Sequence, residues 1–311
     1  TTASAVSTIT KNIGTVSNRG LELTFSGDII RTSEVRWNLG LNMTFLKNKI
    51  ISLPAENREE GIISAPFKRL EGKSIYDYWL PLFAGVDMLT GNSLYIADTE
   101  KYDPTLKEAA HYAFQVDVNG NTYTRNSAYA TRDFLGSAVP KMMGAINTSV
   151  DYKSFSLSGI FTYSLGGKGM DYSYIDLMSL GALPSNIHVD IMNSWDGVPE
   201  GMTATSADRI NPNATPEINF ASSSLNNGTS SRFVFDNSYF VIKNISLGYR
   251  FKQEMLDRIK LKRLSVNLSV ENLATFTNGP TGYSPQQGCG GFSQNQFVPA
   301  RTFSLGVNLG I

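Results

Sequence analysis

Apolar and polar residues alternate with a period of two along seven stretches of the chain. The stretches are 20–30, 36–47, 141–153, 155–166, 239–251, 264–272 and 301–311. In the second, Trp37, Leu39 and Leu41 alternate with Asn38 and Gly40. Successive side chains of a β-strand point to opposite faces, so the pattern predicts seven strands, each with one apolar and one polar face.

The fifth stretch departs from strict alternation near its centre. Counting every second residue puts these on one face: Tyr239, Val241, Ile245, Leu247, Tyr249 and Phe251. Lys243 falls on the same face, whereas Phe240 and Ile242 are apolar on the other. We expect a β-bulge or a local pairing at this point.

The predicted strands are about a dozen residues long, roughly twice the ordinary length. A tilted strand of about 10 residues crosses the apolar layer of a bilayer. The polar faces carry mainly Ser, Thr, Asn and Gly, which suits a water-filled or plugged lumen. Aromatic residues near the ends of the apolar faces are typical of an interfacial girdle; they are Trp37, Tyr152, Phe155, Tyr249 and Phe251.

Short and long connections alternate strictly between the stretches. The short ones are 31–35, a turn at Lys153 and Ser154, and 252–262, for which we expect a short helix; the long ones are 48–140, 167–238 and 273–300. This alternation is typical of outer-membrane barrels, which have short periplasmic turns and long extracellular loops. Such barrels have at least about eight strands, and an open edge cannot face lipid. We therefore expect further strands upstream or in another chain. The opening TTASAVSTIT has no signal-peptide pattern, which indicates a fragment or a processed piece.

Composition narrows the class of protein. The 311 residues include 27 basic and 27 acidic side chains, and this zero net charge argues against a nucleic-acid partner. Charged residues make up 17% and aromatic residues 11%, which fits an all-β protein. The single cysteine, Cys289, excludes a disulfide within the chain and is either free or paired outside it. No apolar run is long enough for a membrane-spanning helix.

The segment DVNGNTY begins like a calcium-binding loop, with Asp117, Asn119 and Asn121 at alternate positions. Thr122 stands where that loop needs glycine, and Ala128 stands where it needs glutamate. We therefore favour a hairpin that turns at Asn119-Gly120.

Other candidate chemistry is scattered. Three residues of the second long connection could bind a metal, or could equally belong to a polar loop: His188, Asp190 and Asp196. Carboxylates that could form a pair for glycoside hydrolysis are Glu59, Glu60, Glu71 and Asp87. The chain has no nucleophile elbow, zinc-protease motif or phosphate loop. We predict no enzyme activity, no metal site and no cofactor.

Six segments that follow these strands resemble SusC/RagA-type TonB-dependent transporters. They are NIGTVSNRGLELTFSGDI (12–29), EGKSIYDYWLPLFAGVDMLTGNSLY (71–95), FLGSAVPKMMGAINTSVDYKSFSLSGIFTYSLGGK (134–168), SYFVIKNISLGYRF (238–251), SVNLSVENLATFT (265–277) and FVPARTFSLGVNLGI (297–311). The second contains the family's GVD-x-x-TG-x-x-x-Y pattern. The chain departs from the family at its last residue, Ile311, where an aromatic residue is common.

This resemblance implies that residues 1–311 are the C-terminal portion of a 22-stranded transmembrane antiparallel β-barrel and form its last seven strands. The plug domain, which TonB contacts, would lie outside this chain. The implied function is TonB-dependent import of oligosaccharides or peptides across the bacterial outer membrane, with a SusD-like surface lipoprotein as partner. Two alternatives stay open: a passive porin or adhesin barrel, and a soluble β-rich glycan-binding protein.

Aromatic residues of the long loops are the candidate substrate contacts. They are Tyr76, Tyr78, Trp79, Tyr283 and Phe292. Aromatic rings stack on sugars and fill apolar pockets at a small entropic cost. The alternative is that each ring packs between loops or against the lipoprotein.

Overall fold

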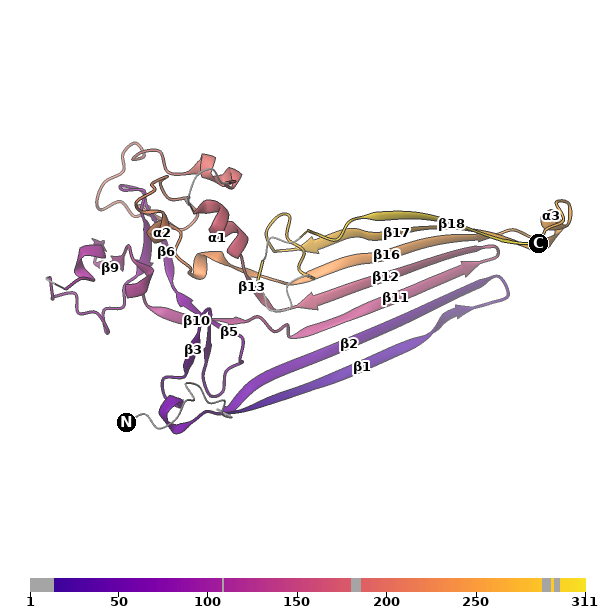
Figure 1. Ribbon diagram of the computed structural model, residues 1–311, viewed down its shortest axis with the longest axis horizontal. Helices are drawn as coiled ribbons and strands as arrows, with labels where there is room; N and C mark the ends of the chain where they lie inside the picture. Colours follow the sequence, from indigo (N-terminus) through magenta and orange to yellow (C-terminus); the bar gives the residue numbers. More distant parts are fainter. Residues whose placement is uncertain (1–13, 108, 180–185, 287–291, 294–296) are drawn as a thin grey trace, which may run out of the picture.

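The computed structural model describes residues 14–107, 109–179, 186–286, 292–293 and 297–311. Seven long strands form one sheet, and the smaller sheets gather beyond one of its ends together with most of the short helices (Figure 1). The seven strands are β1 (Thr15–Arg31), β2 (Val35–Ser52), β11 (Met142–Tyr152), β12 (Phe155–Leu165), β16 (Tyr239–Arg250), β17 (Arg263–Thr277) and β18 (Thr302–Gly310). Every predicted stretch coincides with one of them.

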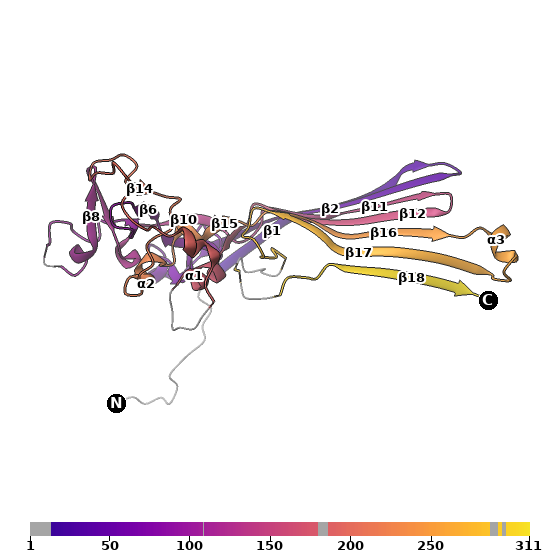
Figure 2. The ribbon, with the colours of Figure 1, turned by 90° about the horizontal axis from the view of Figure 1, so that it is seen from above.

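The seven strands pair in chain order, each antiparallel to the next. Their register places like side chains side by side across the sheet. One row holds Leu157, Leu247, Leu268 and Leu305, and the adjacent row holds Ser158, Ser246, Ser269 and Ser304. We call the side of the leucine row the apolar face and the side of the serine row the polar face. Seen edge-on, the sheet curves and does not close on itself (Figure 2).

A bulge at Lys243 corrects the predicted faces of β16. Ile160 of β12 pairs with Asn244, but the next residue, Phe161, pairs with Ile242, so Lys243 is the extra residue. The shift puts Phe240 and Ile242 on the apolar face and moves Tyr239 and Val241 to the polar face. Strict counting from Ile245 was therefore wrong for Tyr239 and Val241, because one unpaired residue inverts the faces beyond it.

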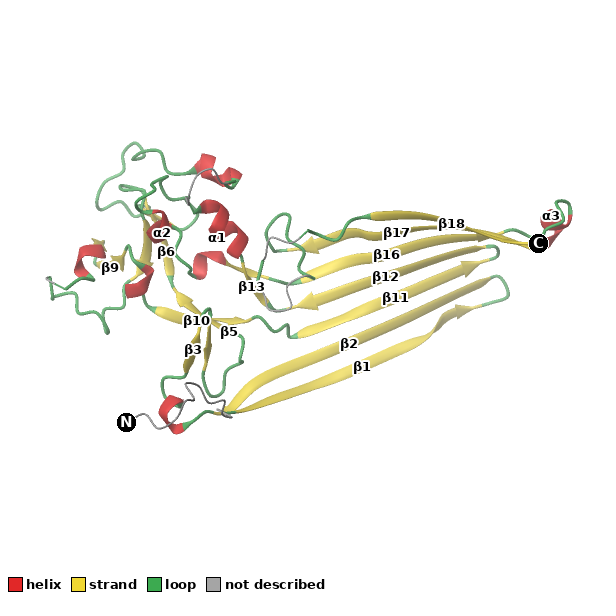
Figure 3. Ribbon diagram, in the orientation of Figure 1, coloured by secondary structure: helices red, strands yellow, loops and turns green. Residues whose placement is uncertain are grey.

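The short connections all lie at one end of the sheet, and the long ones lie at the other (Figure 3). Lys153 has φ 53° in the turn between β11 and β12. The predicted helix is α3 (Gln253–Asp257). Three of the predicted aromatic residues contact one another at this end. The ring centroids of Phe155 and Tyr249 lie 4.7 Å apart, and those of Tyr249 and Phe251 lie 4.9 Å apart. This arrangement is that of an interfacial girdle.

The first long connection has its own secondary structure. Its elements are η1 (Ala55–Asn57), β3 (Ile62–Ser64), β4 (Phe67–Arg69), β5 (Asp77–Pro81), β6 (Phe83–Asp87), β7 (Ser93–Ile96), η2 (Tyr112–Phe114), β8 (Gln115–Val118), β9 (Asn121–Thr124), η3 (Ser127–Tyr129) and β10 (Arg132–Ser137). The sequence pattern predicted only a hairpin at 116–123, because strands of three to six residues are too short to show a period.

The second long connection completes the small sheets. Its elements are β13 (Lys168–Met170), α1 (Tyr172–Met178), η4 (Val189–Asn193), β14 (Ile210–Asn211), α2 (Ser223–Asn226), η5 (Ser231–Phe233) and β15 (Val234–Asp236). The resulting sheets have the orders β10-β5-β4-β3, β13-β15 and β14-β6-β7-β9-β8. The last of these takes β14 from one connection and four strands from the other, so the two connections fold together.

The hydrophobic core lies among the connections. Its buried members are Phe67, Tyr78, Leu80, Ala138, Met170, Ile175 and Phe233. Many side chains on the apolar face of the long sheet are instead exposed, as Leu305 shows with 71% of its surface accessible. None of the helices within the described ranges has the length and hydrophobicity needed to cross a membrane.

Candidate functional site

The structure brings together three of the aromatic candidates around Phe67. Its ring centroid lies 4.9 Å from that of Tyr78, 5.5 Å from that of Phe292 and 5.6 Å from that of Tyr76. Tyr78 has no accessible surface, whereas 42% of Tyr76 is accessible. Of these three rings, Tyr76 is therefore the most accessible, whereas Tyr78 is enclosed in the core.

Trp79 lies on the opposite face of β5 from Tyr78, because neighbouring strand residues alternate in direction. Its ring centroid is 4.7 Å from that of Phe134, and Lys68 Nζ is 4.2 Å from its centre. Lys73 Nζ lies 4.4 Å from the centre of the Phe134 ring. The result is an aromatic pair flanked by two cations, which suits contact with a planar or anionic group.

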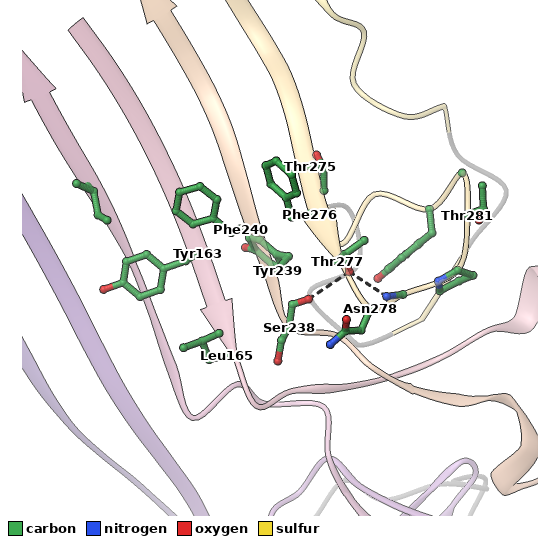
Figure 4. A pocket seen from close by; sticks show the side chains of 15 residues that line it. Tyr163, Leu165, Ser238, Tyr239, Phe240, Thr275, Phe276, Thr277, Asn278 and Thr281 are labelled. Atoms are coloured by element: carbon green, nitrogen blue, oxygen red, sulfur yellow. Dashed lines mark hydrogen bonds between the residues drawn. The ribbon is translucent and has the colours of Figure 1, made fainter.

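Tyr283 lies apart from the other candidates, edge-on to Phe235 at 5.4 Å. It lines a cavity of about 640 Å³ between α1, residues 188–190 and the last long connection. A larger cavity of about 870 Å³ lies on its other side, over the ends of β12, β16 and β17 (Figure 4). Tyr283 is thus the one predicted contact that borders both cavities.

Hydrogen bonds fix the polar groups around the smaller cavity. The Tyr174 hydroxyl donates to Asp190 Oδ2 at 3.0 Å, and the Asp190 amide donates to His188 Nδ1 at 3.1 Å. Burial, together with the nearby Asp190 carboxylate, raises the pKa of Tyr174 to about 12, so its hydroxyl remains a donor. Asp171 accepts from Ser293 Oγ at 2.6 Å. Fixed polar groups beside the Tyr174 and Tyr283 rings suit a sugar or a peptide.

No group of three potential metal ligands occurs within the described ranges. His188 and Asp190 contact each other as above, and neither forms such a group with Asp196. The hairpin prediction for DVNGNTY is confirmed, because β8 pairs with β9 and the turn residues have φ of 51° and 81°. Cys289 lies outside the described residues.

Two of the candidate catalytic carboxylates have structural partners. Glu71 Oε1 accepts from the Leu53 amide at 2.8 Å and from Arg58 Nε at 3.3 Å. Asp87, 1% accessible, accepts two hydrogen bonds of 2.8 Å from Arg209. These contacts give both carboxylates a structural role.

The GVD-x-x-TG-x-x-x-Y segment is a structural anchor. Asp87 also accepts from the Leu89 amide at 3.1 Å. Gly91 has φ 71°, and a Cβ atom there would overlap the Trp195 ring. Tyr95 is 1% accessible and donates to the Leu225 carbonyl at 2.7 Å. The motif thus ties the first long connection to the second.

This anchor should depend on pH. Burial disfavours the Asp87 carboxylate, but the hydrogen bonds from Arg209 and Leu89 outweigh it, so the pKa of Asp87 lies below its usual value. A lowered pKa stabilises the fold above the unfolded-state value of about 4, and this stabilisation is lost as the pH falls through the folded-state pKa. We expect protease resistance of β6 and β14 to hold above about pH 4 and to fall below it. An Asp87→Asn variant should lack that dependence; a variant with the same acid transition would contradict the assignment.

Sequence reasoning missed Tyr174, Phe134 and Lys68. Tyr174 is on α1, a helix of seven residues that has no periodic signal. Phe134 and Lys68 contact Trp79 only because β10, β5 and β4 are neighbours in a sheet. No local pattern in the sequence indicates either contact.

The chain has a long antiparallel sheet with one apolar face suited to lipid, and its folded loops gather at one end of that sheet. This architecture defines the class of outer-membrane receptor barrels. The family model described as TonB dependent receptor-like, beta-barrel matches residues 1–273, and the chain belongs to this family. The predicted barrel class and outer-membrane location are thereby confirmed. The family also favours a receptor over a passive porin, an adhesin or a soluble protein.

Individual relatives agree with this assignment. The chain is 27% identical to TonB-dependent receptor P3 of Formosa agariphila, over 98% of this chain and 30% of that protein. It is 25% identical to TonB-dependent receptor SusC of Bacteroides thetaiotaomicron, over 97% of this chain and 27% of that protein. The structure of the RagAB peptide transporter aligns with a TM-score of 0.69 at 20% identity, over 97% of this chain and 30% of that one, and shows the same fold. The chain thus spans less than a third of the length of these relatives.

Proposed function

We propose that the chain belongs to an importer that carries oligosaccharides or peptides across the outer membrane in a TonB-dependent cycle, and that it is not an enzyme. In this proposal it forms the C-terminal seven strands of a 22-stranded barrel and three of its extracellular loops. The observation that carries the proposal is the match of residues 1–273 to the receptor family. Relatives named as a peptide transporter and as SusC support the two substrate classes.

The same proposal implies further parts of the transporter, namely the other barrel strands, a plug and a surface lipoprotein. Other strands would pair with the free edges of β1 and β18, because unpaired backbone groups are too costly in lipid. A plug segment inside the barrel would receive the pull of TonB. A SusD-like lipoprotein would cover the loops, and substrate would bind between it, the plug and the loops.

Within the loops, Tyr76, Trp79 and Tyr283 are the proposed substrate contacts. Tyr78 and Phe292 would act indirectly, because they pack on Phe67, which contacts Tyr76. The smaller cavity beside Tyr283 offers ring faces together with fixed donors and acceptors. This combination binds sugars and peptides by stacking and by directional hydrogen bonds.

The test uses the full receptor in detergent with two probes, a pool of maltooligosaccharides and a pool of tryptic peptides. Retained ligands are counted by native mass spectrometry. Tyr283→Ala should weaken the retained ligand by roughly 2 kcal/mol, about thirtyfold, as for an aromatic anchor in a binding site. Tyr152→Ala, which removes an exposed ring at the opposite end of the sheet, is the control and should change nothing.

Two results would count against the proposal. Equal retention by Tyr283→Ala and Tyr152→Ala would remove Tyr283 from the binding site. Retention of neither pool by the wild-type receptor would exclude both substrate classes.

A further inference from the structure

Charged residues are distributed unequally between the two faces of the long sheet. The register puts most of them on the polar face: Glu22, Asp28, Arg31, Arg36, Asp151, Arg250, Arg263 and Glu271. Lys243, in the bulge, also reaches polar-face groups, since Gln286 binds both Lys243 and Thr162. The apolar face carries three charged residues, Arg19, Lys47 and Lys49, and all three are cations. This face therefore has no carboxylate on any of the seven strands.

The three cations form one cluster at the loop end of β1 and β2. Arg19 pairs directly with Lys47, and Lys49 pairs with Ser17, which is two residues from Arg19 on β1. All three side chains are exposed, and no carboxylate of the described ranges lies within 4.0 Å of them. Like charges placed opposite each other on neighbouring strands repel and destabilise the pair. Such a cluster is stabilised when an anion binds to it.

The height of this cluster matches the membrane interface. Apolar-face residues of β2 run from Trp37 to Phe45, and Lys47 is the next residue on that face. At about 3.3 Å per residue and a tilt of about 40°, this apolar run covers roughly 20 Å of depth, near the height of a barrel's apolar band. Since the family is an outer-membrane barrel, the apolar face meets lipid. Arg19, Lys47 and Lys49 therefore lie level with the headgroups at the loop side.

An apolar cavity lies near the same end of the sheet, with β11 between most of its walls and the cluster. Its walls include Tyr163, Leu165, Phe240 and Phe276, all on the apolar face (Figure 4). Leu165 pairs with Met142, which pairs with Phe45, one apolar-face position before Lys47. Cations beside an open apolar cavity are complementary to an amphiphile that has an anionic head and acyl chains.

We propose that Arg19, Lys47 and Lys49 form a binding site for the phosphate groups of a membrane glycolipid whose acyl chains lie along the apolar face. We expect the ligand to be a lipid rather than free phosphate, because the cations border an apolar surface and not a closed polar pocket. This inference rests on the outward face of the barrel and is independent of the proposed import activity.

The test places the full receptor in phosphatidylcholine nanodiscs that contain diphosphoryl lipid A as a minor component. Native mass spectrometry counts the lipid A molecules retained. Arg19→Gln, Lys47→Gln and Lys49→Gln combined should lower relative retention roughly fivefold for each charge removed. The matched control removes three exposed cations at the turn end, Lys252→Gln, Arg258→Gln and Lys262→Gln, and should retain lipid A as the wild type does.

Further arms separate the remaining possibilities. A heat-modifiable band on gels confirms that each variant is folded. Inorganic phosphate in excess should fail to displace lipid A; complete displacement would make this a simple anion site and overturn the proposal. Unchanged lipid A retention by the cluster variant would also overturn the proposal. If the cluster variant lost a bound polypeptide but kept its lipid A, the cluster would instead be a protein interface.

Discussion

Replacing Arg209 with methionine should destabilise the loop assembly by about 3–5 kcal/mol, because it leaves a buried carboxylate without its partner. The side chains of Asp87 and Arg209 are 1% and 11% accessible, and their closest oxygen–nitrogen distance is 2.8 Å. The contact joins β6 of the first long connection to the segment before β14 of the second. Hydrogen exchange of the β6 and β14 amides in the full receptor measures the loss, while exchange in the seven long strands should stay unchanged.

Two further variants test the physical cause. Lys168→Met breaks the ion pair between Lys168 and Asp236, whose side chains are 38% and 40% accessible respectively. Because this pair is exposed, its loss should lower the stability of the loop assembly by less than about 1 kcal/mol. The double variant Asp87→Leu, Arg209→Met removes both charges and should recover much of the stability lost in the single variant. If the double variant is as unstable as Arg209→Met, lost packing rather than the unpaired charge is responsible.

Replacing Leu305 with arginine should cost about 2–4 kcal/mol of barrel stability, since it puts a charge on the lipid face near the middle of β18. Leu305 is 71% accessible in the chain and pairs with Leu268, within the row of leucines that crosses four strands. Urea titration of the full receptor folded into lipid vesicles gives the free energy of unfolding. The amount of heat-modifiable receptor in outer-membrane fractions gives an independent measure of assembly.

The matched control is Ser304→Arg, one residue away on the same strand. Ser304 belongs to the row of serines on the polar face, where an arginine can remain in water. Its cost should be below about 1 kcal/mol, because the lumen tolerates charge. Equal effects of Leu305→Arg and Ser304→Arg would mean that the two faces are not a lipid side and a lumen side.

The candidate site was only partly predictable from the sequence. Tyr76, Tyr78 and Phe292 were named because aromatic residues in loops suit ligand contact, and all three prove to surround Phe67, which had not been singled out. Burial separates their roles, since Tyr78 is enclosed and Tyr76 is exposed. Likewise, the smaller cavity is lined by Tyr174 and Tyr283, which are far apart in the chain. Burial and long-range proximity have no local signature in a single sequence.

The alternation of apolar and polar residues by itself determined the seven strands, their two faces except in the first part of β16, and the side from which the long loops emerge. It could do so because each long strand meets lipid on one side and water on the other, so that every second residue reports its surroundings. Only the tertiary structure decided that the irregularity expected in β16 is a bulge with Lys243 as the extra residue. It also decided the small sheets of the loops and the buried Asp87–Arg209 pair. These depend on contacts between residues distant in the chain, which no repeating local pattern encodes.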